Sequence, residues 1–232
     1  MILQEIPSSI FALNAGIPGI DTAWLIDVRD FNDYIYDIKQ YLSDEEISRS
    51  REIRFENARR VFYLRKGILR IILGSFLNIK PDEIKYGYSA NGKPFVFNSG
   101  CEGYRFNISH SNEYLFVGLA QNVDIGVDVE KINMERKHSL LAESVFSPEE
   151  MALYNGYNEQ DRLFSFYKAW VQKEAISKAV GVGISIGFNK FSVDIDPHSN
   201  NVQYSMKLDN YKCNCKMNVR FKDDYFLAAA TI

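Results

Sequence analysis

The feature that most constrains the fold is an apolar run from Val123 to Ile132 that carries two carboxylates. Its β-branched residues and flanking polar turns predict a strand, and the side chains of a strand alternate between its two faces. Asp128 and Glu130 are therefore expected to point the same way. Two carboxylates on one face of a buried strand repel each other unless a cation or a basic partner joins them. Mg²⁺, which takes hard oxygen ligands, would be such a cation.

A second charged segment lies in a predicted helix over about 161–180, which ends at a Gly-Val-Gly turn. Apolar residues recur in this helix at intervals of three and four, as packing of one face requires. Trp170, Glu174 and Lys178 then share a face, so a third carboxylate lies beside a lysine that could contact a phosphate oxygen. Alone, such a pair is more typical of a solvated helix surface, and an isolated Asp-x-Glu is more typical of an exposed edge strand.

Five motifs occur in a fixed order, and their combination is far more specific than any one of them. They are Gly92-Lys93-Pro94, Phe106-Asn107-Ile108-Ser109-His110-Ser111, Gly126-Val127-Asp128-Val129-Glu130, Phe146-Ser147-Pro148-Glu149-Glu150 and Trp170-Val171-Gln172-Lys173-Glu174-Ala175-Ile176-Ser177-Lys178. In this order the motifs resemble the 4′-phosphopantetheinyl transferases of the surfactin-synthetase-activating type. The resemblance spans roughly Arg51 to Gly187.

The resemblance implies an α+β fold of two similar halves related by a pseudo-twofold axis, with the active site in the cleft between them. We place the N-terminal half at 1–120 and the C-terminal half, which carries the metal site, at 121–232. The sequence is compatible with this division, because each half offers a long predicted helix followed by strands. A monomer is expected, since both halves of the cleft come from one chain, whereas the short trimeric acyl-carrier synthases have one such half per chain.

The activity implied by the resemblance is that of a holo-carrier-protein synthase. Such an enzyme transfers 4′-phosphopantetheine from its co-substrate coenzyme A to a serine of an apo acyl-, aryl- or peptidyl-carrier protein and releases 3′,5′-ADP. The implied ligands of Mg²⁺, or alternatively of Mn²⁺, are Asp128, Glu130 and Glu174. Carriers of fatty-acid, polyketide and nonribosomal-peptide synthesis all fit the sequence.

The resemblance also implies contacts to coenzyme A. Lys93, Ser109, His110 and Lys178 are implied to contact its phosphates, and Arg54, Arg60 and Arg65 are candidates for its 3′-phosphate and adenosine end. From the residues alone, cations on a helix are typical of a solvated face, and a lysine in a turn is usually only exposed. Ser109 and His110 are expected on a loop at a strand end, and as adjacent residues they cannot readily form the nucleophile-to-base pair of a hydrolase.

Glu150 has two interpretations. Serine as a cap, proline at the first helical position and glutamates in the first turn predict a helix start, which accounts for the Phe-Ser-Pro-Glu-Glu segment locally. The resemblance instead implies that Glu150 acts as a general base or orients the base water. Together with Glu174 and Lys178 it completes the set of predicted catalytic residues.

Composition excludes several other classes of protein. A sequence pI of about 5.7 and a formal net charge of −3 do not favour nucleic-acid binding. No apolar stretch reaches the roughly 18 residues that cross a bilayer, and the amino end lacks a basic signal-peptide region, so we expect a cytoplasmic protein without membrane partners. Two alternatives stay open: a Mg²⁺-dependent phosphodiesterase or nucleotidyl hydrolase that acts on coenzyme A-like pyrophosphates, and a non-catalytic binder of coenzyme A or of a carrier protein.

The remaining pattern predicts elements that flank these motifs. The segment to Ile20 is weakly patterned, and a capping box predicts a helix after Ser43. Further predicted elements are a helix over 57–77 and strands over 23–28, 83–88, 114–120, 189–194, 202–208, 215–221 and 226–232.

Overall fold

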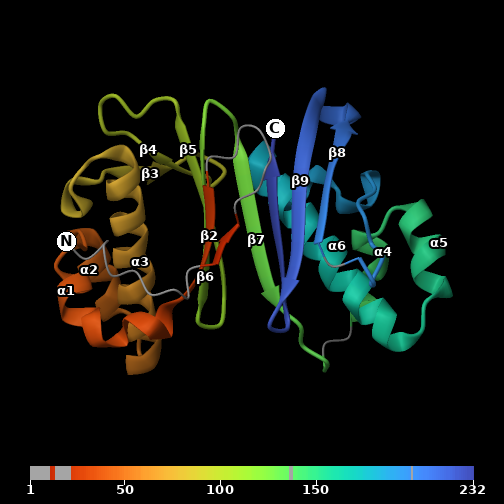
Figure 1. Cartoon of the computed structure of the whole chain (residues 1–232), viewed down its shortest axis with the longest axis horizontal. Coiled ribbons are helices and arrows are strands. Elements are labelled where there is room, and N and C mark those ends of the chain that lie inside the picture. The colour runs from red at the N-terminus through yellow and green to blue at the C-terminus, as the bar shows by residue number, and fades with distance from the viewer. Residues whose placement is uncertain (1–10, 14–21, 136–137, 200) are drawn as a thin grey trace.

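The computed structural model describes residues 11–13, 22–135, 138–199 and 201–232, and most of the weakly patterned segment to Ile20 lies outside them. The protein is a mixed helix and sheet structure, as predicted. Figure 1 shows its four layers in order: helix α3, a first sheet, a second sheet and helix α6.

The first sheet comes from the N-terminal part of the chain, in the strand order β1-β2-β6-β5. This part of the chain contains β1 (Phe11–Leu13), β2 (Thr22–Asp27), α1 (Ile35–Lys39), α2 (Asp44–Arg51), α3 (Glu56–Leu77), β5 (Tyr104–Ser111) and β6 (Tyr114–Gln121). A separate hairpin pairs β3 (Tyr86–Tyr88) with β4 (Pro94–Val96). Helix α3 packs on one face of this sheet through the apolar side chains that its sequence repeats at helical intervals.

The second sheet comes from the C-terminal part of the chain, in the strand order β7-β10-β9-β8. This part of the chain contains β7 (Ile125–Lys131), α4 (Ala142–Val145), α5 (Pro148–Gly156), α6 (Glu159–Val180), β8 (Asn201–Leu208), β9 (Cys213–Lys222) and β10 (Tyr225–Thr231). Apolar side chains of both sheets form the core between them, and the outer face of the second sheet packs on α6. The division into halves at 120/121 remains a prediction, although the sheets separate at the short connection between β6 and β7.

Helix boundaries follow the predicted caps. Ser43 and Glu46 form the capping box of α2, and Ser147 and Glu150 form that of α5. Helix α6 ends at Gly181, whose φ of 79° is the left-handed conformation that glycine adopts without a steric cost.

The approach of α6 to β7 depends on Gly126. A Cβ atom at this position would lie 2.0 Å from the carbonyl oxygen of Ala175 and 2.3 Å from the amide nitrogen of Ala179. Because both atoms belong to the backbone of α6, no side-chain movement could relieve that clash. Gly126 therefore brings the strand with Asp128 directly against the helix with Glu174 and Lys178.

Edge strands β5 and β7 meet through side chains instead of a backbone ladder. Asn107 Oδ1 accepts a hydrogen bond from the Val127 amide at 3.0 Å, and Ser111 Oγ accepts one from the Lys131 amide at 3.1 Å. Between them, Ser109 Oγ donates to Asp128 Oδ1 at 2.7 Å. We call this junction the β5–β7 seam.

Three sequence predictions need correction. Ser109 and His110 lie within β5 and not on a loop, because the segment pairs in register with β6 as far as Ser111. The strand predicted over 83–88 is shorter, since Pro81–Glu83 forms a 3₁₀ turn. No strand occupies 189–194: Phe188–Lys190 is a 3₁₀ turn, and the Val193 amide donates to the Glu150 carboxylate instead of to a sheet. Among the residues described, no helix has both the length and the apolar character needed to span a membrane.

Candidate active site

Asp128 is the central side chain of the β5–β7 seam. It is 4% exposed, and its Oδ1 accepts hydrogen bonds from Ser109 Oγ at 2.7 Å and from Lys178 Nζ at 2.6 Å. Its Oδ2 is buried and has no hydrogen-bond partner within the described part of the chain. A buried carboxylate oxygen without a donor is costly, so this atom is suited to a ligand that supplies positive charge.

Lys178 connects the three elements of the site. Its ammonium extends from α6 and donates to Asp128, to the carbonyl oxygen of Val127 on β7 at 3.2 Å and to Ser109 Oγ on β5 at 3.2 Å. Because the side chain stays 27% exposed, the ammonium can also meet an anion from solvent.

Glu174 lies one turn before Lys178 on α6 and is affected by the charge of Asp128. Burial and the nearby Asp128 carboxylate raise the pKa of Glu174, and Lys178 opposes part of that rise. The two carboxylates thus repel each other across the contact of α6 with β7. A divalent cation between them would remove this cost.

Glu130 follows Asp128 by two residues on β7 and occupies the same face of the strand, as predicted. Its Oε2 lies 3.4 Å from Ser111 Oγ, which donates to it. Within the described residues, no group of three such side chains already has the arrangement of a metal centre. Asp128 with its unpartnered oxygen and Glu174 with its raised pKa nevertheless fit a hard cation, whereas the part of Glu130 as a third ligand stays a prediction.

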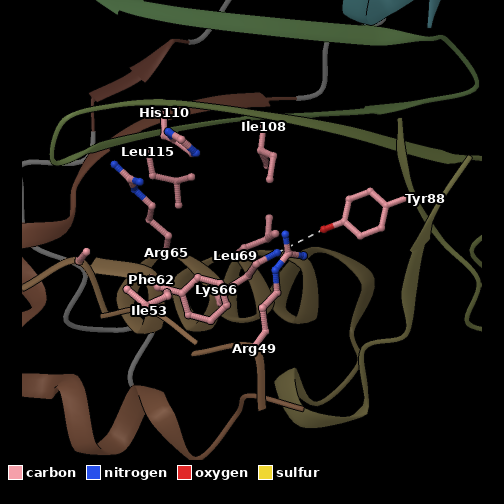
Figure 2. Close-up of a pocket in the computed structure, with 11 residues that line it drawn as sticks. Arg49, Ile53, Phe62, Arg65, Lys66, Leu69, Tyr88, Ile108, His110 and Leu115 are labelled. Carbon is pink, nitrogen blue, oxygen red and sulfur yellow. Dashed lines mark hydrogen bonds between the residues drawn. The ribbon is translucent and has the colours of Figure 1, made fainter. Parts of the chain in front are cut away.

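A pocket of about 600 Å³ opens on the other face of β5 (Figure 2). Strand alternation sends Ser109 toward β7 and its neighbour His110 into this pocket. Among the described residues that line it, four can carry positive charge and none is a carboxylate; the four are Arg49, Arg65, Lys66 and His110. Apolar and aromatic side chains, among them Phe62 and Tyr88, form the rest of the wall. We call this the cationic pocket; its composition suits a phosphorylated ligand with a planar ring.

His110 and Arg65 lie close together in the cationic pocket. Loss of solvent and the charge of Arg65 lower the pKa of His110, so its ring is a neutral donor near pH 7. The Arg65 guanidinium donates to the carbonyl oxygen of Asn112, while its Nε is buried with no hydrogen-bond partner among the described residues. Burial lowers the pKa of Arg65, which is the expected effect on a cation that lacks full compensation.

The structure separates the predicted arginines. Arg60 lines a different pocket beside α1, donates to Asn57 and Asn32 and lies 3.7 Å from Glu113, and Arg54 is exposed over the ring of Phe55. Only Arg65 enters the cationic pocket. Sequence reasoning missed Arg49, Lys66 and Tyr88 there; the one available indication was that Lys66 follows Arg65 in a helix already rich in cations.

Lys93 makes its contacts away from the seam, at the end of α6. Its ammonium lies 2.6 Å from Asp124 Oδ1 and donates to the carbonyl oxygen of Ala179 at 2.6 Å. Asn91 from the same hairpin donates to the carbonyl oxygen of Gly181 at 3.0 Å. The β3–β4 hairpin thus holds the C-terminal end of α6, the helix that carries Glu174 and Lys178.

Glu150 lies in a separate buried cluster. It is 2% exposed; its Oε2 accepts from the Ser147 amide at 2.7 Å and from Lys173 Nζ, and its Oε1 accepts from the Val193 amide at 2.7 Å. Both oxygens therefore already have donors. In this placement Glu150 holds neighbouring segments together, and its role as a base stays a prediction.

Comparison with known proteins identifies one family and relatives within it. A model of the 4′-phosphopantetheinyl transferase superfamily matches residues 124–230. The 4′-phosphopantetheinyl transferase HetI of Nostoc is 32% identical over 163 residues, which cover 70% of this chain and 69% of the relative. A phosphopantetheinyl transferase of Thraustochytrium is 29% identical over 68% of this chain and 59% of its own length. The 4′-phosphopantetheinyl transferase psf-1 of Bacillus pumilus is 26% identical over 82% of this chain and 78% of its own length.

Proposed function

The chain belongs to the 4′-phosphopantetheinyl transferase superfamily, as its motifs predicted, and from this premise we propose that it is a holo-carrier-protein synthase. It would transfer the 4′-phosphopantetheine arm of coenzyme A to a serine of an apo acyl-, aryl- or peptidyl-carrier protein. The observation that supports this most strongly is the unpartnered Asp128 oxygen beside Glu174, one strand from a cationic pocket. A metal-assisted reaction on a pyrophosphate uses carboxylates that bind the metal and cationic side chains that bind the phosphates.

We assign the metal to Asp128 and Glu174, with Glu130 completing the set. When bound, Mg²⁺ or Mn²⁺ would neutralise charge on the coenzyme A pyrophosphate. Lys178 already bridges β5, β7 and α6, and its partly exposed ammonium would bind a phosphate oxygen at the same point. Ser109 would orient both Asp128 and Lys178.

The cationic pocket would hold the 3′-phosphate and adenosine end of coenzyme A. Arg65 and His110 line the face of β5 opposite the seam, and Arg49 and Lys66 belong to the same cavity. To reach both the pocket and the carboxylates, one extended anion would pass around the edge strand β5. In the transfer, the carrier serine oxygen bonds to the β-phosphorus as the bond from this phosphorus to 3′,5′-ADP breaks. Positioning and electrostatics contribute most to such a reaction. We further propose a monomer, because one chain supplies both the pocket and the carboxylates. The cytoplasmic location stays a prediction from the sequence.

The test is to incubate the protein with coenzyme A, Mg²⁺ and two apo carriers, one fatty-acid and one peptidyl, and to weigh the carriers by mass spectrometry. One phosphopantetheine arm should be gained, and EDTA or Glu174→Gln should prevent the gain. Release of 3′,5′-ADP without any change in carrier mass would instead identify a hydrolase. Binding of coenzyme A without either reaction would identify a non-catalytic binder.

A further inference from the structure

A buried carboxylate joins three elements behind the cationic pocket. Glu46, from the first turn of α2, accepts hydrogen bonds from the Ser43 amide at 3.0 Å, from Arg70 Nε at 2.7 Å and from the Tyr86 hydroxyl. Glu46 and Arg70 are 8% and 4% exposed. Burial alone would raise the pKa of Glu46, but the bonds from Tyr86 and Ser43 and the charge of Arg70 lower it, so it is a carboxylate at neutral pH.

The hydroxyl of Tyr86 links this carboxylate to a cation of the pocket. Because its proton is donated to Glu46, its oxygen is left to accept, and Lys66 Nζ lies 3.5 Å from it. The same ammonium donates to the Tyr88 hydroxyl at 3.2 Å, shown as a dashed line in Figure 2, and lies 5.4 Å from the centre of the Tyr86 ring. Within the described chain, Lys66 is thus held by phenols and has no direct ion pair, although Glu45 and Glu46 line a second small cavity with it.

The ammonium of Lys66 also belongs to the wall of the cationic pocket. Arg49, which follows Glu46 in α2, lines the same cavity, and so does Tyr88. Arg70, Glu46, Tyr86 and Lys66 therefore form one connected row from the protein interior to the pocket, and the row ties α2, α3 and β3 together. A fixed ammonium loses less side-chain entropy when it binds an anion than a free surface lysine does.

We propose that Tyr86 and Glu46 are positioning residues that fix the Lys66 ammonium for a phosphate monoester, the 3′-phosphate of coenzyme A. The assignment of that ligand rests on the proposed function. The phosphate carries its charge at the end of the nucleotide, where a preplaced cation discriminates it from a hydroxyl. Lys66 is then a residue that selects coenzyme A over its 3′-dephosphorylated form.

Tyr86→Phe isolates this role because it removes only the hydroxyl. The ring contacts to Phe106, with centroids 6.0 Å apart, and to Arg70, 5.3 Å from the ring centre, remain possible. Tyr104→Phe is the matched control: its half-buried ring packs against Phe76, with centroids 5.8 Å apart, outside the cationic pocket.

The experiment measures binding of 3′,5′-ADP and of 5′-AMP by calorimetry, two probes that differ in the 3′-phosphate alone. We expect Tyr86→Phe to weaken 3′,5′-ADP binding by about 5- to 10-fold and to change 5′-AMP binding less than about 2-fold, since a hydrogen bond to a charged group is lost. Lys66→Met should weaken 3′,5′-ADP binding by at least as much. Tyr86→Phe in the Lys66→Met background should add nothing, because Tyr86 acts through Lys66.

Equal losses for both nucleotides, or a full additional loss in the Lys66→Met background, would overturn the inference and leave Tyr86 with a general structural role. Glu46→Gln repeats the test if Tyr86→Phe does not fold: it keeps an acceptor and should give a smaller loss, again confined to 3′,5′-ADP. A wild-type protein that transfers the arm yet binds both nucleotides equally would overturn this inference alone. Absence of both transfer and 3′,5′-ADP binding would overturn the proposed function as well.

Discussion

Helix α6 carries two lysines that each pair with a carboxylate of another element, Lys173 with Glu150 and Lys178 with Asp128, and the two pairs differ in the structure. Lys173 is fully buried against Glu150, and its ammonium also donates to three carbonyl oxygens, those of Val145, Phe188 and Phe191. Lys178 pairs with Asp128 at 2.6 Å, but one oxygen of that carboxylate lacks a partner within the described residues. Both carboxylates are nearly buried, so burial does not distinguish them. They differ in their hydrogen bonds: both oxygens of Glu150 have donors, whereas Oδ2 of Asp128 has none among the described residues.

This difference separates a structural pair from a candidate functional one. A saturated buried pair has no remaining capacity for a ligand, and it fixes the segments that supply its partners. The Lys173 cluster ties α4, α5 and the 188–191 turn to α6. In an unsaturated pair, the buried oxygen without a donor lowers the stability of the fold, and a bound cation can remove that cost.

The largest effect is expected at the saturated pair. Lys173→Met leaves the Glu150 carboxylate buried without its cation and should lower the free energy of unfolding by about 3–5 kcal/mol. Chemical denaturation of both proteins measures this directly. Glu150→Gln is the companion: activity per folded molecule should stay near that of the wild type. A stable Glu150→Gln protein that cannot transfer would instead restore Glu150 as the base.

At the unsaturated pair the expected loss is in rate. Glu174→Gln should reduce transfer to a carrier by at least about 100-fold, or about 2.7 kcal/mol in activation free energy, because a metal ligand is lost. Its melting temperature should be equal to that of the wild type or higher, since repulsion with Asp128 disappears. Steady-state kinetics and a thermal melt decide this, and a strongly destabilised variant would show that Glu174 is needed for folding.

A smaller effect concerns pH in the absence of metal. Because the pKa of Glu174 is raised in the folded protein, the folded state holds this proton more tightly than the unfolded chain does. The unfolding free energy of the wild type relative to Glu174→Gln should therefore fall as pH rises from the ordinary glutamate pKa to the raised one, and stay level above it. Added Mg²⁺ should shrink this fall. Thermal melts of both proteins in EDTA and in Mg²⁺, at several pH values across this range, measure the difference in unfolding free energy. A difference that does not change with pH would contradict the prediction.

The smallest effect is expected where the hairpin holds α6. Asp124 is 47% exposed, so Asp124→Asn should cost only about 0.5 kcal/mol in unfolding free energy, and Lys93→Met, which also loses the bond to the helix end, about 1 kcal/mol. A double-mutant cycle measures their coupling. The predicted phosphate contact of Lys93 gives a different pattern: Lys93→Met raises KM for coenzyme A, whereas Asp124→Asn leaves KM unchanged.

Local chemistry made much of the fold predictable. Both capping boxes, the long helices and the strand with Asp128 follow from side-chain period and cap residues, which act within a few positions of the chain. The position of Ser109 and His110 in a strand was missed because polar residues in that segment resemble a loop. Their polarity serves the β5–β7 seam, where Asn107, Ser109 and Ser111 bond to a strand that the sequence cannot place beside them.

Contacts between distant segments were not predictable from the letters. Nothing in the sequence shows that Glu150 meets Lys173 or that Lys93 meets Asp124, because these pairs depend on how whole elements pack. The same holds for the arginines: Arg60 and Arg65 share a helix, yet helical rotation sends them to different pockets. The family resemblance named Ser109 and Asp128 of the seam, whereas the cationic pocket with Arg49 and Lys66 is visible only in the structure.

The close contact of β7 with α6 depends on an atom that is absent, the Cβ of Gly126. The separation of the β7 carboxylates from Glu174 and Lys178 is a spacing between strand and helix backbones, and a single methyl group would act as a wedge between them. The absence of a side chain at Gly126 therefore sets the distance between the charged groups of α6 and those of β7.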